Sequence, residues 1–283
     1  MPTADEIREN QRKAWSVAAA GWERSADWYG RNFAAAFEGL CRAAGAAPGK
    51  RLLDVACGAG QPALRLAALV GPLGRVVAID LSSEMLAVAA RQARAAGHHD
   101  IEWLEMGAES LGFPDGSFDG VSCGFALMFC PDPVRAATEM RRVLVPGGRV
   151  AVVVWDQRNL CPYLETLFAA VAQFFAPAPP ADPKAPGGFR LSPPGELEAV
   201  LRAAGLSDVG VESLSLDLEF ASLDEYWQVT LDQAAGLRSR LDTLSEAERA
   251  RLAEVVREAL LPFTTDGRMR IGARVLLGSG TRR

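Results

Sequence analysis

The residues best suited to bind a ligand lie at positions 52–63, which read LLDVACGAGQPA. An apolar run there ends at Asp54 and is followed by Gly58, Gly60 and Pro62. Glycine permits positive φ angles and a close approach of the backbone to a ligand, and proline is favoured in the first turn of a helix. The stretch therefore predicts a strand, a glycine loop and a helix whose N–H groups face a bound molecule.

Two classes of cofactor use such a loop, dinucleotides and S-adenosylmethionine. The spacing Gly58-x-Gly60-x-x-Ala63, with Asp80 further along the chain, fits the loose dinucleotide pattern. A carboxylate at Asp54 would repel a pyrophosphate, whereas it would stabilise the ammonium and sulfonium groups of S-adenosylmethionine. Asp54 therefore favours S-adenosylmethionine as the cofactor.

The composition argues against several other classes of function. The chain has 283 residues, 49% hydrophobic and 23% charged, which is typical of a globular protein with one large domain or one domain plus a cap. The net charge of −5, without a basic run, argues against nucleic-acid binding and favours a small-molecule acceptor. No apolar run is as long as a membrane span, so stable membrane insertion is not expected.

The cysteines and histidines predict neither a metal site nor a disulfide framework. The five cysteines contain no Cys-x-x-Cys pair, and the two histidines are adjacent in sequence. An odd number of cysteines, without a recognisable signal peptide, predicts a cytoplasmic protein.

Four stretches resemble class I S-adenosylmethionine-dependent methyltransferases. The run DVACGAG at 54–60 is similar to motif I of that class. The runs VVAIDLSSEMLAVA at 76–89, AESLGFPDGSFD at 108–119 and EMRRVLVPGGRV at 139–150 resemble the ubiquinone/menaquinone-biosynthesis-like (methyltransferase type 11) subgroup. The resemblance implies transfer of a methyl group from S-adenosylmethionine to an O, N or C nucleophile. It leaves the acceptor open, because a fold does not determine a function.

We expect an α/β, Rossmann-like fold with a seven-stranded sheet of order 3-2-1-4-5-7-6, strand 7 antiparallel, and a helical cap. The strands are expected at 51–56, 75–79, 101–105, 118–123, 149–155, 208–220 and 271–278. Residues 1–48 are expected to form an N-terminal helical cap, and 49–283 the cofactor-binding domain with cap insertions at 157–190 and 222–262. In the helix expected at 132–145, Arg135, Arg141 and Arg142 are expected to face solvent. The oligomeric state is left open.

The cofactor is expected across the carboxyl ends of the first, second and fourth strands. Asp80 ends the second strand, where a carboxylate can accept two hydrogen bonds from a ribose diol. The resemblance implies contacts to the methionine part near the glycine loop and the N-terminal cap, and contacts to adenine further along. The predicted cofactor-binding residues are Trp22, Asp54, Ala56, Gly58, Gly60, Asp80, Leu81, Met85, Ala108, Glu109, Cys123 and Phe125.

One position departs from the pattern of the subgroup. The usual sequence is Gly-Asp-Ala-Glu, and its aspartate accepts a hydrogen bond from the adenine amino group. Here the sequence is Met106-Gly107-Ala108-Glu109, so Gly107 replaces that aspartate. We expect either that Glu109 or backbone takes over this contact, or that adenine is held more loosely.

Two sets of residues are candidates for binding the acceptor and for activating it. The aromatic residues of the cap segments suggest a flat or apolar acceptor, although each could equally belong to the core: Trp22, Trp28, Tyr29, Phe168, Phe174, Tyr226 and Trp227. Tyr29, Asp156, Tyr163 and Glu165 are candidate bases by location alone, with Tyr29 and Asp156 the two catalytic candidates that we retain. Proximity and alignment could also suffice without a base.

Two other functions stay open at this point. An NAD-dependent oxidoreductase is disfavoured by Asp54 and by the Pro-Gly-Gly turn at 146–148. A non-catalytic protein that binds S-adenosylmethionine as a partner or regulatory subunit is favoured by Gly107, and disfavoured by the other cofactor motifs, which are present. Binding of S-adenosylhomocysteine but not of NADH would argue against the oxidoreductase, and formation of a methylated product would argue against the non-catalytic protein.

Overall fold

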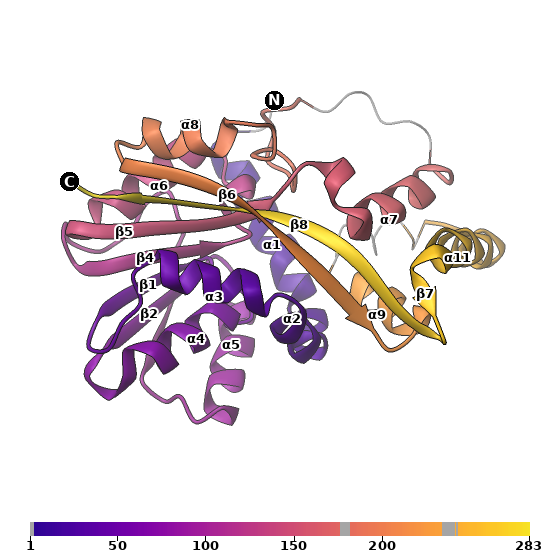
Figure 1. Ribbon diagram of the computed structural model, residues 1–283, viewed down its shortest axis with the longest axis horizontal. Helices are drawn as coiled ribbons and strands as arrows, with labels where there is room; N and C mark the ends of the chain where they lie inside the picture. The colour runs from indigo at the N-terminus through magenta and orange to yellow at the C-terminus, as the bar shows by residue number, and fades with distance from the viewer. Residues whose placement is uncertain (1–2, 176–181, 234–240, 242) are drawn as a thin grey trace.

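A mixed β-sheet with helices on both faces forms the centre of the computed structural model, which describes residues 3–175, 182–233, 241 and 243–283 (Figure 1). Seven long strands run in the order β3-β2-β1-β4-β5-β8-β6, and a two-residue strand, β7, pairs with β8 alone. Because β8 is the seventh long strand and is antiparallel to β5 and β6, the predicted order and the antiparallel last strand are confirmed.

The first five strands are parallel and end at one edge of the sheet. Their apolar runs fit burial on both faces of a parallel sheet. The carboxyl ends of parallel strands meet at a common edge, so the residues that follow β1, β2, β4 and β5 lie near one another there. The strands are β1 (Arg51–Val55), β2 (Arg75–Asp80), β3 (Ile101–Glu105), β4 (Phe118–Gly124) and β5 (Leu144–Trp155).

Helices cover the two faces of this parallel part. On one face, α3 (Ala34–Ala43), α4 (Gln61–Val70) and α5 (Ser83–Ala95) pack on residues such as Leu52 and Val76. On the other face, α6 (Pro133–Arg142) and α8 (Glu196–Ala203) pack on their sequence neighbours Leu53 and Val77. The alternation follows from the strand period of two, which turns successive side chains to opposite faces.

Several local signals in the sequence begin helices as expected. Ser82 accepts a hydrogen bond from the N–H of Met85 at the start of α5, and Pro62 lies in the first turn of α4. The run from Ser245 to Glu248 forms a capping box at the start of α11 (Glu246–Leu260). At the N-terminus, α1 (Ala4–Arg24) and α2 (Ala26–Asn32) precede α3 within the region predicted to be helical.

The last two long strands extend beyond the rest of the sheet (Figure 1). Strand β8 (Arg268–Thr281) pairs with β5 only from Val275 onward, whereas its earlier residues pair with β6 (Ser207–Phe220). This overhanging ribbon packs against α7 (Pro162–Ala172), α9 (Leu223–Gln233) and α11. Residues of the two predicted cap insertions thus lie together on the ribbon.

Several boundaries differ from the predicted ones. Strand β5 begins at Leu144 rather than at position 149, because the Pro146-Gly147-Gly148 turn lies within the paired segment, and α6 therefore ends at Arg142. Strand β8 is longer than 271–278 at both ends. Parts of the loop predicted at 177–190 and of the helical region predicted at 222–262 lie outside the described residues. Within the described part, no helix has the length and apolar character needed to cross a membrane.

Candidate functional site

A cavity of about 280 Å3 lies at the carboxyl edge of the parallel strands. Residues at or just after the ends of β1, β2, β4 and β5 line it, and α1, α2, α7 and α9 contribute further side chains. Of the predicted cofactor-binding residues, those that line the cavity are Trp22, Ala56, Gly58, Asp80, Leu81, Met85, Ala108, Glu109 and Phe125. The sequence motifs therefore converge on one site.

The glycine loop borders this cavity at Gly58. Gly58 has φ of +53°, and a Cβ built on it would meet no atom within 4 Å, so the loop presents bare backbone beside open space. Gly60 plays a different part and is not among the lining residues. Its φ is +93°, and an added Cβ would lie 2.9 Å from the Cβ of Ala89, so glycine is needed there for packing against α5.

Asp80 lines the cavity and also holds the loop in place. One carboxylate oxygen accepts a hydrogen bond from the N–H of Gly58 at 2.9 Å, and the other accepts from the N–H of Ser82 at 2.9 Å. Burial raises the pKa of Asp80, and the two backbone N–H groups oppose that rise. Each carboxylate oxygen can accept more than one hydrogen bond, so the group can still bind a diol.

Asp54 lies beneath the loop rather than in the cavity wall. Its side chain is fully buried, and Ser122 Oγ donates a hydrogen bond of 2.6 Å to one oxygen, whereas the second oxygen has no partner. Burial raises the pKa of Asp54 to about 7, and the nearby charge of Asp80 acts in the same direction. Asp54 is absent from the cavity wall, so a direct contact with a ligand is not supported, and the expectation that stays is an effect of its charge through a loop N–H or water.

Two cavity residues adopt a backbone conformation that is unfavourable for side chains. Ala56 follows β1 and has φ of +54°, and Phe125 follows β4 and has φ of +57°. A left-handed conformation costs a non-glycine residue on the order of 1–3 kcal/mol, and such residues cluster at functional sites. Both lie where the cavity meets the strand ends, which supports a ligand-binding role for this edge.

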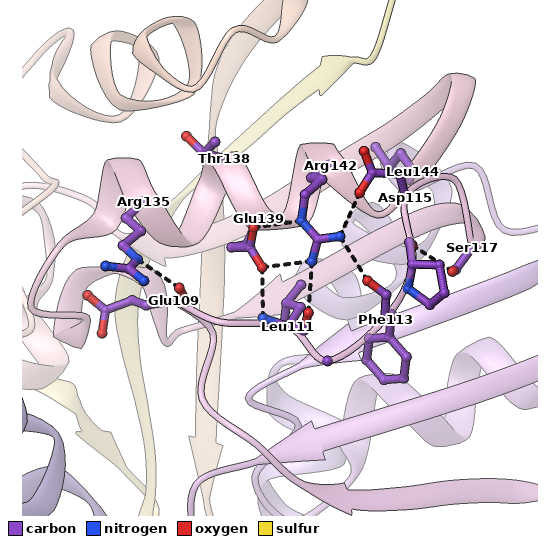
Figure 2. A network of polar contacts seen from close by, with 12 residues as sticks. Glu109, Leu111, Phe113, Asp115, Ser117, Arg135, Thr138, Glu139, Arg142 and Leu144 are labelled. Atoms are coloured by element: carbon purple, nitrogen blue, oxygen red, sulfur yellow. Dashed lines mark hydrogen bonds and ion pairs between the residues drawn. The ribbon is translucent and has the colours of Figure 1, made fainter.

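The segment that carries Ala108 and Glu109 is fixed to α6 by arginines (Figure 2). Arg135 Nε donates to the backbone carbonyl of Glu109 at 3.0 Å. Arg142 donates to the carboxylate of Glu139, to Asp115 and to the carbonyls of Leu111 and Phe113, with distances of 2.7–2.8 Å.

The expectation that α6 turns its arginines to solvent is confirmed for Arg135, which is exposed, and is wrong for Arg142. Arg142 keeps only 29% of its side chain exposed, and the two carboxylates raise its pKa. These arginines bridge the helix and the cavity-lining segment.

The carboxylate of Glu109 is already engaged by protein groups. It accepts hydrogen bonds from Arg8 Nη1 at 2.8 Å and from the N–H of Asp132 at 2.7 Å, and it is 5% exposed. Arg8 belongs to α1, so Glu109 fastens that helix over the cavity. Gly107 has no side chain and Ala108 has only a methyl group, so these two residues present mainly backbone to the cavity.

Further contacts along α1 hold the helix on both sides of the cavity. Ser16 bonds to Ser82, and Glu23 pairs with Arg91 of α5. Arg24 pairs with Asp232 of α9 at 2.5 Å. Helix α1 thus connects α5, on the parallel part of the sheet, with α9, on the ribbon.

One group of lining residues is rich in aromatic rings that contact one another, and we call this group the aromatic end of the cavity. Trp22 meets Tyr29 edge-on at 4.8 Å between ring centroids, and Phe125 lies 4.9 Å from Trp155. Its lining residues are Trp22, Tyr29, Phe37, Phe125, Trp155, Tyr163, Leu164, Leu167, Phe168, Thr230 and Gln233. These side chains carry no formal charge, so this end favours a neutral, flat ligand.

Only some of the candidate bases line the cavity. Tyr29 and Tyr163 line the aromatic end, but burial raises the pKa of both hydroxyls, so they serve as neutral hydrogen-bonding groups and not as bases. Glu165 is absent from the cavity walls and pairs with Arg158.

Asp156 also has no place in the cavity. It accepts hydrogen bonds from the N–H of Gln157 at 2.7 Å and from Ser213 Oγ at 2.6 Å, which gives it a structural role. The candidacy of Asp156 as a base is therefore corrected.

The prediction that Cys123 contacts the cofactor is also corrected. The residue is fully buried among the apolar side chains between the sheet and α6, and it does not line the cavity. Burial raises its thiol pKa well above the usual value. Its neighbours Gly124 and Phe125 line the cavity instead, because the strand period turns the Cys123 side chain to the other face.

Sequence reasoning missed several lining residues, among them Arg8, Gln11, Thr230 and Gln233. They lie on α1 and α9, where the helical period indicates a buried face but not what that face covers. No motif in the sequence marks them. The described residues also contain no group of three His, Cys, Asp or Glu side chains that could hold a metal ion.

Comparisons with known proteins agree with this site. The chain belongs to the ubiE/COQ5 methyltransferase family, whose model matches residues 38–179. It is 41% identical over 114 residues to a 2-phytyl-1,4-naphtoquinone methyltransferase of Synechocystis sp., covering 40% of this chain and 48% of the relative. It is 37% identical over 129 residues to a demethylmenaquinone methyltransferase of Listeria welshimeri, covering 46% and 54% of the two chains. This confirms the predicted family, and with it S-adenosylmethionine as the cofactor.

The likeness is confined to part of each protein. The chain spans about half the length of the curated relatives that it matches. Among solved structures it resembles the [4+2]-cyclase SpnF, with a TM-score of 0.52 and 26% identity, covering 87% of this chain and 79% of that one. A cyclase with this fold illustrates that the fold alone does not define the reaction.

Proposed function

We propose that this protein transfers a methyl group from S-adenosylmethionine to a carbon, oxygen or nitrogen nucleophile of a small, neutral, flat acceptor. One observation carries the proposal. The predicted cofactor residues and an uncharged aromatic end share the same cavity, so a cofactor and an apolar acceptor can lie next to each other. The names of the relatives favour a quinone-type ring as the acceptor.

The residues at the loop end fit S-adenosylmethionine. Asp80 would hold the ribose diol, and the backbone beside Gly58 leaves space for the methionine part. Leu81, Met85 and Ala108 supply apolar and backbone surface for adenine. When bound, the cofactor supplies an electrophilic methyl group on a positively charged sulfur.

The aromatic end would serve the reaction by position and by exclusion of water. Trp22, Tyr29 and Phe125 offer ring faces, which stabilise a nearby cation by cation–π attraction. A dry site that aligns the nucleophile with the methyl group lowers the barrier largely through proximity. The neutral hydroxyls of Tyr29 and Tyr163 can hydrogen-bond an acceptor oxygen.

In this proposal the acceptor is nucleophilic by itself and is not activated by a base of the protein. Within the described lining residues, the aromatic end offers no carboxylate or imidazole. An electron-rich quinol ring needs no strong base before attack, because its hydroxyl groups already increase electron density at the ring carbons. The proton released afterwards can pass to solvent.

Two further parts of the proposal concern location and domain organisation. All five cysteines are free, which supports a reducing compartment, and we keep the cytoplasm as the proposed location. We also keep residues 1–48, 157–190 and 222–262 as cap segments around the acceptor. The cavity residues contributed by α1, α2, α7 and α9 support that division.

Calorimetric titration with S-adenosylhomocysteine and, in parallel, with NADH tests the cofactor assignment. We expect micromolar binding of the first and no binding of the second, since a family member of this kind recognises a nucleoside without a pyrophosphate. Binding of NADH instead would favour the oxidoreductase alternative. Binding of S-adenosylhomocysteine without product from any quinol or phenol acceptor would favour a non-catalytic partner.

A further inference from the structure

The segment expected to bind adenine lacks the carboxylate of the subgroup pattern, because Gly107 stands in its place. Glu109 is an unsuitable replacement, since its carboxylate already accepts hydrogen bonds from Arg8 and from the N–H of Asp132. Another polar side chain lines the same cavity one helical turn from Arg8, namely Gln11 of α1. Gln11 is therefore a candidate for the missing adenine contact.

Helix α1 crosses the two segments on which adenine is expected. Arg8 Nη1 donates to the carboxylate of Glu109 at 2.8 Å, in the segment after β3. Ser16 Oγ lies 3.0 Å from Ser82 Oγ, in the segment after β2. Residues 8 and 16 are separated by about 12 Å along the helix axis. Gln11 lies between these two anchors, over the region between the two adenine segments.

The face of α1 that carries Gln11 is the face that lines the cavity. The α1 residues among the lining residues are Arg8, Gln11, Trp15 and Trp22, at successive spacings of three, four and seven positions. Residues at these spacings share one face of a helix. The partly buried side chain of Gln11 is therefore directed toward the cavity.

Trp15 fixes the direction in which the Gln11 carboxamide points. Trp15 Nε1 donates a hydrogen bond to Gln11 Oε1 at 3.1 Å. An indole N–H can only donate, so the oxygen of the carboxamide turns toward Trp15 and the amide nitrogen presents its two hydrogens elsewhere. Trp15 is itself held edge-on against Phe129, with 5.6 Å between the ring centroids. Reversal of the carboxamide would break this hydrogen bond.

A carboxamide held in this way distinguishes adenine from hypoxanthine, its deaminated form. The ring nitrogen N1 of adenine, beside the amino group, accepts a hydrogen bond. In hypoxanthine the same nitrogen carries a hydrogen and donates. The amide nitrogen of Gln11 pairs with the first and opposes the second, which leaves two donors without acceptors.

We propose that Gln11 is a specificity-determining residue, which selects the adenine base of S-adenosylmethionine by donating a hydrogen bond to N1, and that Trp15 fixes the direction of this bond. The inference concerns the cofactor alone. It therefore stands or falls independently of the acceptor and of the proposed methyl transfer.

The test measures by calorimetry, without an acceptor, the binding of S-adenosylhomocysteine and of S-inosylhomocysteine, which carries hypoxanthine in place of adenine. Wild type is compared with Gln11→Glu, whose carboxylate keeps the side-chain length but only accepts, and with Trp15→Phe, which keeps a ring without the N–H. Lys13→Gln is the control, because the Lys13 side chain is 65% exposed and does not line the cavity.

We expect wild type and Lys13→Gln to prefer S-adenosylhomocysteine by about tenfold, the value of one hydrogen bond that would otherwise leave donors unpaired. In Gln11→Glu the preference should vanish or reverse, because the carboxylate accepts from the N1–H of hypoxanthine and has no hydrogen for adenine. In Trp15→Phe the preference should fall by about threefold or more, because the carboxamide can then turn its oxygen toward that N–H.

The ratio of the two affinities separates this role from a structural one. If Gln11→Glu weakens both ligands by the same factor and keeps the preference of wild type, Gln11 only supports the fold and the proposal is overturned. Equal affinity of wild type for the two ligands, or no binding of either, also overturns it. An unchanged preference in Trp15→Phe overturns the part assigned to Trp15.

Discussion

Asp80 combines two tasks at the level of a single residue, since it holds the glycine loop and faces the cavity. Asp80→Asn keeps one oxygen for the backbone but removes the charge, so we expect S-adenosylhomocysteine to bind about 10- to 100-fold more weakly, the value of a charge-assisted hydrogen bond. Calorimetry measures the affinity. Glu102→Gln is the control, because Glu102 pairs with Arg75 and does not line the cavity. Unchanged affinity in Asp80→Asn would contradict the ribose contact.

Asp54 gives a prediction about pH. Burial raises its pKa to about 7, so the free protein binds a proton there that the unfolded chain would have released. The ammonium group of a bound cofactor favours the ionised carboxylate, so the complex binds fewer protons than the free protein. By linkage, the affinity for S-adenosylhomocysteine therefore rises between about pH 6 and about pH 8.

Calorimetry across that range checks the pH dependence, with Asp54→Asn as the matched variant. Asparagine cannot ionise, so the slope should flatten and the affinity at the upper end should fall. A slope that persists in Asp54→Asn would assign the pH dependence to another group.

Residues in the site were predictable to different degrees. Asp80 and Gly58 could be identified because each lies at or just after the end of a parallel strand, next to a glycine loop or a helix cap. In this kind of fold, residues at that place usually border a ligand. Thr230 could not be identified, because the pattern of an amphipathic helix indicates which face is buried but not that this face lines a cavity. Asp156 was misplaced because the sequence shows where β5 ends, but not that Ser213 of the neighbouring ribbon takes up its carboxylate.

Among the elements, the junction of α1 and α9 is tested by Gly21→Ala. In most helices this change stabilises by about 0.5–1 kcal/mol. Here the new Cβ would lie 2.2 Å from the carbonyl oxygen of Asp232, so we expect a net loss of about 1–3 kcal/mol in the free energy of unfolding. Urea denaturation measures it. Val17→Ala on the same helix, at a residue that is 74% exposed, should stay close to wild type. A more stable Gly21→Ala protein would show that the two helices do not pack in this way.

The segment at Gly107 allows a gain of function to be tested. Gly107 does not have a positive φ, and a Cβ there would meet only Leu81 Cδ2, at 3.2 Å, which a flexible side chain can relieve. Gly107→Asp should therefore tighten binding of S-adenosylhomocysteine by about 3- to 10-fold through a hydrogen bond to adenine. Gly107→Ala adds the Cβ without the carboxylate and is the matched control. Equal affinities in the two variants would place adenine elsewhere.

The elements themselves were largely predictable. The order of the strands follows from the resemblance and from runs such as Val76–Asp80, and it is confirmed by the pairing of β8 with β5 and β6. The start of β5 was missed because Pro146 and the following glycines have the composition of a turn, although the chain stays paired around them. Local composition could not reveal that pairing, because it depends on Phe118 of the adjacent strand.

At the scale of the whole molecule, the overhang of β6 and β8 packs against α7 and α9, which contribute side chains to the cavity. Most of the predicted cofactor-binding residues lie at or just after the ends of the parallel strands, whereas α7 and α9, which pack on the ribbon, supply the lining residues Tyr163, Phe168 and Thr230. The family model ends at residue 179, before the ribbon begins. Because α7 lies within the matched residues, differences in acceptor between relatives are expected to arise from the ribbon and α9.

The most direct measurement is a transfer assay with S-adenosylmethionine that carries a deuterated methyl group. The purified protein is incubated with the labelled cofactor and reduced 1,4-dihydroxynaphthalene, and the products are analysed by mass spectrometry. Methyl transfer would yield an acceptor that has gained one labelled methyl group, together with an equal amount of S-adenosylhomocysteine. If the bound cofactor is recovered intact and every quinol or phenol tried is recovered unlabelled, the central claim of methyl transfer to a flat neutral ring is contradicted.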